Sequence, residues 1–492
     1  MISQFPKRNA LCVNERFYTY KQFGESISKI RCEIKKLRKD EIYIGLVAND
    51  DIETYASIFA LWLEGKAYVP LHPNHPLDRA EIVIKDVNIK TILDSDDIAM
   101  FSSHNVINTN HLVFQDEFLV NDVAVAEDCI AYILFTSGST GTPKGVTISR
   151  KNLGAFLESF WDSGIEISEE DRCLQGYDLT FDASVQCYLT SLTRGACMYT
   201  IPHDQIRFSY VYGLFTDHQL TNVSVVQSML RYLRPYFDEI YLPKLKYCLM
   251  IGEASSGDLI REWKNCVPNA DIYNYYGPTE ATVYCSSYKV DIPKVKTLYG
   301  MLSVGKPMKN VKLIIVDDDC NIVSQGEKGE LCICGDHVSP GYWNNPEKNS
   351  KSFFEKEFDG VTERFYRTGD LSYKDDEDDF MLYGRLDSQA KINGYRIELG
   401  EIEFHAREHL KGHNAAAMIF TNNIGNVELA IFLEGEKIDT QSLIDYIKTK
   451  VPPYMVPTNV MVEPKFPLNS NGKVDKIKLR ERLPDNFELR II

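Results

Sequence analysis

A stretch of glycines and hydroxyl side chains with a single lysine, residues 136–145 (TSGSTGTPKG), has the composition of a loop that binds phosphate. Glycine lets the backbone approach an anion closely, hydroxyls donate hydrogen bonds to it, and an ammonium neutralises its charge. The stretch is not a Walker A loop, because Pro143 stands where that motif requires glycine and no Ser or Thr follows the lysine. A flexible surface loop rich in Ser and Gly is the alternative. The candidate phosphate-binding residues are Thr136, Ser137, Gly138, Ser139, Thr140, Gly141 and Lys144.

The elements that position this loop are predicted from the apolar pattern around it. Residues 130–135 (IAYILF) form a short apolar run that predicts a buried strand ending directly at the loop. Similar runs alternate with segments of helical length, which is typical of an α/β fold with parallel strands. The predicted strands are 42–47, 223–226, 245–251 and 272–276, and 52–62 is a predicted helix.

The pattern changes after residue 310. The runs 311–316 and 329–333 indicate antiparallel hairpins, and we interpret the acidic run 374–379 as a solvated turn between two strands, with no ligand assigned.

The last hundred residues have a compact α+β pattern. It predicts a helix over 397–410, a strand over 427–433 and a helix that begins at an Asp439 cap and runs to residue 450. We therefore place a domain boundary near Asp387, between a large domain over 1–386 and a small domain over 387–492.

Bulk composition narrows the function classes. A chain of 492 residues is long enough for two or three domains, and its net charge of −16 argues against nucleic acid or an anionic membrane as the main partner. No apolar run is long enough to span a bilayer, and the first residues lack a secretion signal, so we expect no membrane insertion and a cytoplasmic location. The 12 cysteines include no CxxC pair, which favours reduced core thiols. His405, His409 and His413 repeat at four-residue steps, and we interpret them as a solvated stripe rather than metal ligands.

Several further blocks along the chain, taken with the phosphate loop, resemble the adenylate-forming superfamily. They occur in the order and at the approximate spacing of that superfamily, and weaker matches extend the resemblance over nearly the whole chain. Its amino-acid-activating branch, which includes nonribosomal peptide synthetase adenylation domains and D-alanine–carrier protein ligases, is the most similar. The blocks are 276–280 (YGPTE), 366–370 (YRTGD), 384–387 (GRLD) with Lys391, 394–398 (GYRIE) and 471–473 (NGK).

The resemblance implies a fold and a nucleotide site. The implied fold is α/β, with two α/β layers and a small β-barrel-like part in the large domain, followed by a smaller, mobile α+β domain. The implied reaction joins a carboxylate to the α-phosphate of ATP and expels pyrophosphate, so charge neutralisation and alignment would dominate catalysis. The phosphate loop, including catalytic Thr136, would hold the β- and γ-phosphates. The other implied ATP-site residues are Asn274 and Tyr276 at adenine, Thr279 at the α-phosphate, Glu280 at catalytic Mg²⁺, Asp370 at ribose, and Arg385 at the domain junction.

The resemblance also implies a catalytic lysine and a hinge. Lys473 would bridge the substrate carboxylate and the α-phosphate and so be the principal catalytic residue. Asp387 would be the hinge about which the small domain turns, exchanging Lys473 for a thiol-transfer face that carries Lys391 and Gly394. A lone lysine near the end of a chain is otherwise a solvated residue.

A substrate pocket is implied around residues 181–186. In the amino-acid-activating branch the aspartate matching Asp182 pairs with the substrate ammonium, since a buried carboxylate needs a cation. An aspartate that caps a local turn is the alternative. The large tyrosines suggest a small, alanine-like amino acid, although Gln186 and the tyrosine hydroxyls equally suit a polar one. The pocket residues are Phe181, Asp182, Ala183, Gln186, Leu249, Ile251, Gly252, Tyr275, Val283 and Tyr284.

These observations lead to a stand-alone ligase that adenylates a small amino acid with ATP and Mg²⁺. Because the sequence ends about twenty residues after Lys473, we expect the acceptor to be phosphopantetheine on a separate carrier protein, with coenzyme A as the second choice. An acyl- or aryl-coenzyme A ligase and a non-catalytic binding protein that retains the fold are the alternatives.

Overall fold

The computed structural model describes residues 1–98, 100–115, 124–138, 141–358, 360–387, 389–411, 413–422, 424–467 and 474–482. Three predicted site residues, Ser139, Thr140 and Lys473, lie outside these ranges. The chain divides into two compact units. Unit 1 comprises Met1–Pro73, Ile84–Leu134 and Gly145–Tyr383, and unit 2 comprises Asn74–Val83, Phe135–Lys144 and Gly384–Ile492.

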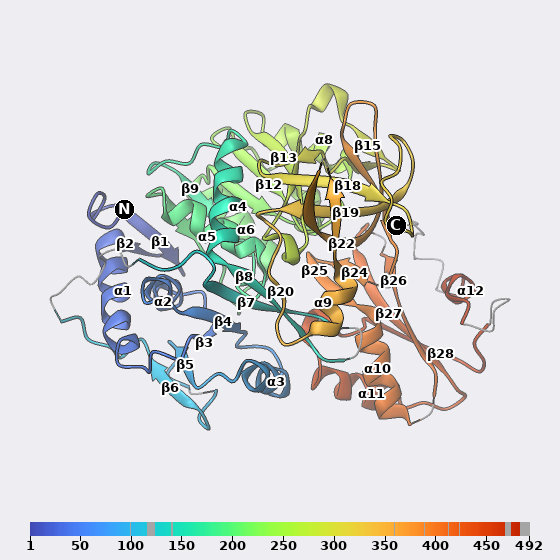
Figure 1. The fold of residues 1–492 in the computed structure, drawn as a ribbon, viewed down its shortest axis with the longest axis horizontal. Coiled ribbons are helices and arrows are strands. Elements are labelled where there is room, and N and C mark those ends of the chain that lie inside the picture. The colour runs from blue at the N-terminus through green and yellow to red at the C-terminus, as the bar shows by residue number, and fades with distance from the viewer. Residues whose placement is uncertain are drawn as a thin grey trace. The chain divides into compact units, whose positions relative to one another are not determined.

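A seven-stranded sheet has the order β20-β8-β7-β4-β3-β5-β6 (Figure 1). Its strands from β7 to β6 pair in parallel, as the alternation of apolar runs and helices predicted. Buried apolar runs of this kind need cover on both faces of a sheet. The elements are β3 (Tyr43–Val47), β4 (Ala67–Leu71), β5 (Thr91–Asp94), β6 (Asn105–Asn108), β7 (Ile130–Thr136), β8 (Lys144–Ser149), β20 (Gly341–Tyr342), α1 (Tyr20–Ile34), α2 (Ile52–Leu63), α3 (Leu77–Val87), α4 (Arg150–Asp162) and α9 (Pro346–Ser352).

A nine-stranded sheet has the order β17-β14-β13-β12-β11-β9-β10-β1-β2, with a parallel centre and antiparallel edges. Trp263 and Phe215 are fully buried in the cluster formed by this sheet and its helices. The elements are β1 (Asn9–Val13), β2 (Arg16–Thr19), β9 (Arg172–Leu174), β10 (Cys197–Tyr199), β11 (Asn222–Val225), β12 (Tyr247–Met250), β13 (Asp271–Tyr276), β14 (Ser286–Lys289), β17 (Lys306–Pro307), α5 (Ala183–Leu192), α6 (Arg207–His218), α7 (Gln227–Leu233) and α8 (Gly257–Cys266).

The β-rich part predicted after residue 310 is an antiparallel sheet of five strands. In the described residues it runs from β18 at one edge to β21 at the other without the two edges pairing, so the expected barrel-like part is an open sheet. The acidic run 374–379 is the turn between two of its strands, and there Lys296 pairs with Asp375 and Asp379. The strands are β18 (Val311–Val316), β19 (Gly329–Gly335), β21 (Phe353–Phe358), β22 (Val361–Lys374) and β23 (Phe380–Arg385), and a two-stranded ribbon, β15 (Thr297–Leu298) with β16 (Met301–Leu302), lies outside it.

Unit 2 contains a sheet of three strands whose two faces are covered differently. Alternate side chains of a strand point to opposite faces. Ala417 and Ile431 therefore pack with α10 and α11, whereas Met418 and Phe432 pack with Leu479 of α12. The elements are β24 (Gln389–Ile392), β25 (Tyr395–Glu398), β26 (Ala415–Thr421), β27 (Val427–Glu434), β28 (Asn459–Glu463), α10 (Leu399–Leu410), α11 (Thr440–Lys448) and α12 (Lys476–Arg480).

Two details of the small domain differ from the sequence prediction. The helix expected from residue 397 begins at Leu399, because Ile397 belongs to β25 and is fully buried. His405 is mostly buried and lies 3.5 Å from Glu408, so the three histidines do not form a solvated stripe. The Asp439 cap is confirmed, since its carboxylate accepts a hydrogen bond from the backbone N–H of Ser442.

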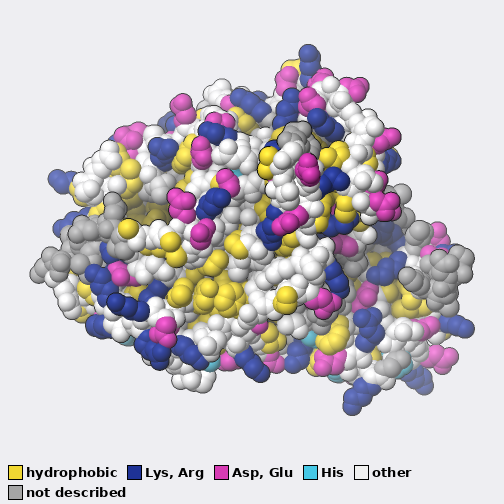
Figure 2. Space-filling view, in the orientation of Figure 1, with side chains coloured by type: hydrophobic (Ala, Val, Ile, Leu, Met, Phe, Trp, Pro, Cys, Tyr) yellow, Lys and Arg dark blue, Asp and Glu magenta, His cyan; other side chains and the backbone are white. Residues whose placement is uncertain are grey.

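The surface carries both signs of charge. Figure 2 shows acidic and basic side chains interspersed over the visible face. Among the described residues, no helix is long and apolar enough to cross a membrane. All 12 cysteines are free thiols and most are buried, as expected.

Candidate functional site

The end of β13 places two predicted adenine-site residues in buried positions. Asn274 donates a hydrogen bond from Nδ2 to the carbonyl oxygen of Ser303 at 2.8 Å. Its Oδ1 is buried and accepts no hydrogen bond from the described residues. A buried carbonyl oxygen without a donor costs free energy, so this atom suits a ligand that brings an N–H group. The adenine amino group predicted for Asn274 is such a donor.

The ribose block is tied to β13 by a short hydrogen bond. Tyr276 donates from its hydroxyl to Oδ2 of Asp370 at 2.5 Å, and Asp370 lies on β22. Burial, followed by the charge of Asp370, raises the pKa of Tyr276 well above its usual value, so the phenol keeps its proton. The hydroxyl of Thr368 fixes the backbone next to Asp370, because it donates a hydrogen bond to the Leu331 carbonyl and accepts one from the Asp370 N–H. The carboxylate therefore has a defined orientation.

The predicted magnesium residue lies in a buried polar setting. Glu280 belongs to a short 3₁₀ turn (Thr279–Ala281), is 1% exposed, and accepts a hydrogen bond at Oε1 from the Tyr342 hydroxyl at 2.5 Å. Gly277 makes this turn possible, because a Cβ there would lie 2.2 Å from the Cα of Tyr284. Carboxylate oxygens are the protein ligands that Mg²⁺ prefers, so the donor chemistry fits the ion.

The phosphate loop already binds anionic groups within unit 2. Lys144 pairs with Oε1 of Glu398 at 2.9 Å, and both side chains are largely buried. The Gly138 N–H donates to Oε2 of Glu401 at 3.0 Å, while Oε1 of Glu401 pairs with Arg79 at 2.6 Å. An ammonium and a backbone N–H directed at carboxylate oxygens are the donors that phosphate also requires.

The loop backbone accounts for its glycines. A Cβ on Gly138 would lie 1.9 Å from the Thr142 carbonyl oxygen, and Gly141 has a φ of +81°. Ser137 donates from its hydroxyl to the Arg396 carbonyl and accepts from the Glu398 N–H, and Thr136 donates from Oγ1 to the Lys144 carbonyl at 3.4 Å. In the described part of the stretch, these hydrogen bonds hold the loop in place, and its role in phosphate binding stays a prediction.

The junction residues of unit 2 contact one another. Arg385 forms a bidentate pair with Asp387, with Nη2 2.7 Å from Oδ2 and Nε 3.0 Å from Oδ1. Burial opposes ionisation of Asp387, but the Arg385 hydrogen bond and charge hold the pKa of this carboxyl below its usual value. Lys391 lies on β24, and Gly394, with a φ of +82°, turns the chain into β25. The hinge at Asp387 and the domain bounds 1–386 and 387–492 stay predictions.

The predicted pocket begins at the N-terminus of α5. Phe181 and Ala183 flank Asp182, which is 9% exposed and stands at the N-cap position, but its side chain forms no capping hydrogen bond with the helix. Asp182 therefore does not cap α5. Gln186 uses its amide within the protein, since Oε1 accepts from Ser224 at 2.8 Å and Nε2 donates to Thr190 at 3.2 Å.

The two tyrosines predicted for the pocket lie against each other. The rings of Tyr275 and Tyr284 lie 4.2 Å apart, and the Tyr275 hydroxyl is 3.2 Å from Ser163 Oγ. The Tyr284 hydroxyl is buried and has no hydrogen-bond partner in the part of the chain that the structure describes. Val283, a β-branched residue with a φ of +71°, adopts a backbone conformation that such residues rarely occupy. Leu249 and Ile251 are also buried, and Gly252, the residue after Ile251, has a φ of +94°.

Some partners of the site residues escaped the sequence analysis. The sequence indicated Glu398, because it is the last residue of the 394–398 block, but it did not indicate that Lys144 is the cation with which Glu398 pairs. Arg79, Glu401, Ser303 and Tyr342 lie outside the blocks, and only the folded chain brings them to their partners.

Comparisons with known proteins give the same family. The AMP-binding enzyme family matches residues 2–343. Tyrocidine synthase 1 from Brevibacillus parabrevis is 29% identical over 489 residues, which cover 97% of this chain and 44% of that protein, so the chain spans less than half of this relative.

Two solved structures share the fold. The protein PA1221, described as an NRPS protein containing adenylation and PCP domains, superposes with a TM-score of 0.85 at 23% identity, covering 98% of this chain and 83% of that one. The Vibrio cholerae adenylation domain AlmE, in complex with glycyl-adenosine-5'-phosphate, gives a TM-score of 0.85 at 22% identity, covering 98% and 96%. The matched family, the relative and the shared α/β fold agree with the motif blocks: the chain belongs to the AMP-binding enzyme family, in the amino-acid-activating branch of the adenylate-forming superfamily.

Proposed function

We propose that the protein adenylates a small amino acid with ATP and passes the aminoacyl group to the phosphopantetheine thiol of a carrier protein. The observation that carries the amino-acid part is the burial of the Asp182 carboxylate at the start of α5. A carboxylate removed from water is stabilised by a cation, and the ammonium of an amino acid supplies one. The glycyl-adenosine-5'-phosphate bound to AlmE and the PCP domain of PA1221 support the proposal by similarity.

The side-chain pocket favours a small, apolar substrate group. Gln186 has its amide occupied by Thr190 and Ser224, so it has little left to offer a polar substrate. The rings of Tyr275 and Tyr284, whose centroids lie 4.2 Å apart, are the large side chains among the predicted pocket residues and favour a small substrate group. A side chain of alanine or glycine size is the substrate class that follows.

Adenylation requires two anions to meet, and the residues of this chain divide that task. Asn274 and Asp370 hold the nucleoside, Gly138 and Lys144 hold the outer phosphates after exchanging their carboxylate partners, and Asp182 orients the amino acid. Glu280 would hold Mg²⁺, which when bound supplies positive charge at the phosphates, and Thr279 would contact the α-phosphate. Lys473 would then place its ammonium between the two reacting groups.

Pyrophosphate exchange with a panel of carboxylic acids tests the proposal. We expect exchange with glycine or one of the alanine enantiomers and little with large amino acids or fatty acids. Asp182→Asn, which keeps the side-chain volume, removes the charge and should raise KM for the amino acid strongly while KM for ATP changes little. Exchange only with fatty or aryl acids would point instead to an acyl-coenzyme A ligase, and exchange with no carboxylate would contradict adenylation.

The division of labour between half-reactions is a second test. Lys473→Ala should reduce adenylate formation by about 10²–10³-fold, because a preorganised charge at the reacting centre is lost. Transfer from a supplied aminoacyl adenylate to the carrier thiol should continue. Equal loss of both half-reactions would show that Lys473 does not act specifically in adenylation.

A further inference from the structure

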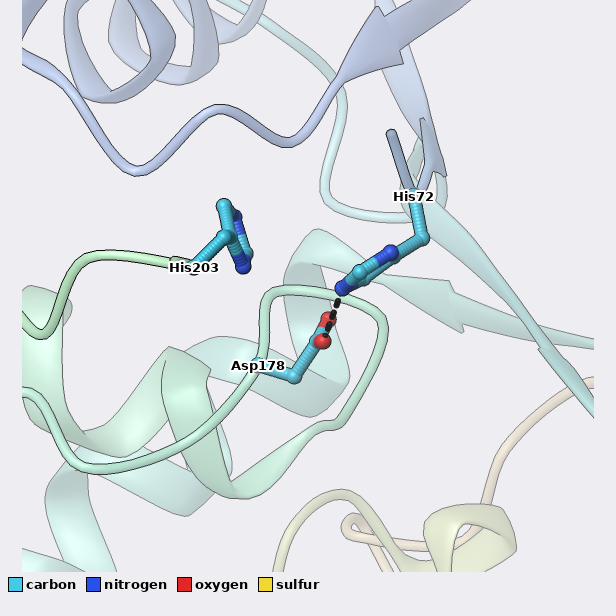
Figure 3. Close-up of side chains that lie close together, drawn as sticks. All are labelled: His72, Asp178 and His203. Atoms are coloured by element: carbon cyan, nitrogen blue, oxygen red, sulfur yellow. Dashed lines mark ion pairs between the residues drawn. The ribbon is translucent and has the colours of Figure 1, made fainter. Parts of the chain in front are cut away.

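Three side chains that no motif singled out converge inside unit 1. His72 follows β4, Asp178 lies between β9 and α5, and His203 follows β10 (Figure 3). Their potential ligand atoms all lie within 4.8 Å of one another, and the two imidazole rings are 4.9 Å apart. The side chains are 9%, 5% and 17% exposed. The cluster thus joins the carboxyl ends of strands from the seven-stranded and nine-stranded sheets.

The carboxylate of Asp178 is oriented by its own loop. Oδ1 accepts hydrogen bonds from the N–H and from the hydroxyl of Thr180, both at 2.8 Å. Oδ2 is directed at Nε2 of His72 at 2.6 Å. A carboxylate that binds a metal is usually held in place by hydrogen bonds of this kind, as Oδ1 is held here by Thr180.

His203 has the hydrogen bond that a metal-binding histidine usually makes. Its Nε2 lies 2.7 Å from the Ala48 carbonyl oxygen, which only accepts hydrogen bonds, so this nitrogen carries the proton. In the neutral ring, Nδ1 therefore holds the lone pair. The Asp50 carboxylate lies 3.3 Å from the same Nε2 and accepts from the Tyr55 hydroxyl at 2.9 Å. When a carbonyl oxygen and a fixed carboxylate both face one ring nitrogen of a histidine, they keep the proton on that nitrogen and leave the other nitrogen as the better metal ligand.

We propose that His72, Asp178 and His203 form a structural site for a divalent transition-metal ion of the zinc class, distinct from the predicted magnesium residue Glu280. Two imidazoles and one carboxylate are a donor set suited to Zn²⁺ rather than to Mg²⁺, and water or substrate commonly supplies a fourth ligand. Zinc bonds of about 2.0–2.2 Å separate tetrahedral ligands by about 3.4 Å, so closing the site needs only small side-chain shifts. The ion takes the place of the proton between His72 and Asp178.

A metal-free ion-pair network is the competing explanation of the same residues. In that case His72 is a cation paired with Asp178, and added metal has no effect on the folded protein. The two explanations differ in what Zn²⁺ does, which makes the choice experimental.

Metal content and thermal unfolding of the full chain, measured without nucleotide, test the site. We expect one Zn²⁺ per chain, and a Tm that rises by several degrees when ZnCl₂ is added to chelator-treated protein and falls again with EDTA, because an ion that binds only the folded state stabilises it. Mg²⁺ at the same concentration should not reproduce the rise. Co²⁺ added to the wild-type protein should give the intense visible absorption of a tetrahedral site with nitrogen and oxygen ligands.

Matched variants assign the effect to the cluster. His203→Ala and Asp178→Asn should lose the Zn²⁺-dependent rise, whereas His111→Ala, which breaks an exposed His–Asp pair with Asp97, should keep it. A Zn²⁺ response of the same size in His203→Ala, or no Zn²⁺ response and no Co²⁺ absorption in the wild type, would overturn the proposal. The Co²⁺ measurement needs no variant, so the test holds even if a substitution prevents folding.

Discussion

The nucleoside side of the site and the phosphate loop satisfy their polar groups in different ways. In unit 1, the carboxylates of Asp370 and Glu280 each accept a hydrogen bond from a neutral tyrosine hydroxyl, that of Tyr276 and that of Tyr342. The buried Oδ1 of Asn274 accepts no hydrogen bond from the described residues, which suits a ligand. In unit 2, Lys144 pairs with a carboxylate of the protein itself, and so does the N–H of Gly138. For the ATP site proposed above, the comparison predicts a preformed nucleoside side and a phosphate loop that exchanges its carboxylate partners for ATP.

The largest effect is expected where a preformed charge in unit 1 is removed. Glu280→Gln should lower pyrophosphate exchange by roughly 10²–10³-fold, because the amide is a poor ligand for Mg²⁺. Tyr342→Phe, which removes only the hydroxyl that orients Glu280, should cost much less. Pyrophosphate-exchange rates measured at varied Mg²⁺ concentration distinguish the two variants. Equal losses of activity in both would mean that Glu280 acts only through its hydrogen bond with Tyr342.

The stability of unit 1 should also be sensitive to acid, because it contains the buried His337. Burial lowers the pKa of His337 to about 4, and its ring contacts Ser159 Oγ at 2.8 Å and the Tyr284 carbonyl at 3.1 Å. An unfolded histidine has a pKa near 6.5, so the unfolded state takes up a proton first and stability falls as the pH drops from about 6.5 towards 4. The full loss is about 3 kcal/mol for this group.

The difference in unfolding free energy between pH 7 and pH 4.5 measures this contribution. It should be smaller in His337→Gln than in the wild type and unchanged in His111→Ala, whose histidine is exposed. An undiminished pH dependence in His337→Gln would show that other groups cause the acid sensitivity.

The ribose contact should give a moderate effect. Asp370→Asn removes the charge that accepts from Tyr276, and we expect KM for ATP to rise roughly 10- to 100-fold, as for the loss of a hydrogen bond to a charged group. KM for the amino acid should change little. A rise in KM for the amino acid alone would show that Asp370 does not contact the nucleoside.

The smallest effect should appear in the phosphate loop. Glu398→Gln keeps a hydrogen bond to Lys144 but removes the competing charge, so KM for ATP should fall about threefold if Lys144 binds phosphate. Glu408→Gln, an exposed change on α10, the helix that follows Glu398, is the control. A higher KM would mean that Glu398 supports the loop rather than competes with ATP for it.

Local patterns in the sequence were sufficient to predict the elements and to name the candidate nucleoside residues. The strand before the phosphate loop, the helix from Ile52 and the Asp439 cap depend on periodicity and on side chains a few residues apart, and all three are present. The motif blocks likewise named Asp370 and Tyr276 because these residue types recur in fixed local order.

Tertiary structure decided which side chains meet. Glu398 reaches Lys144 across 254 residues of chain, and His72 and Asp178 meet from different sheets. Neither pairing follows from spacing, because a side chain's partner across such a separation depends on how the sheets and helices pack. Charge and burial made the pairings specific, since each buried ionic group is stabilised only where the fold supplies an opposite charge or a hydrogen bond.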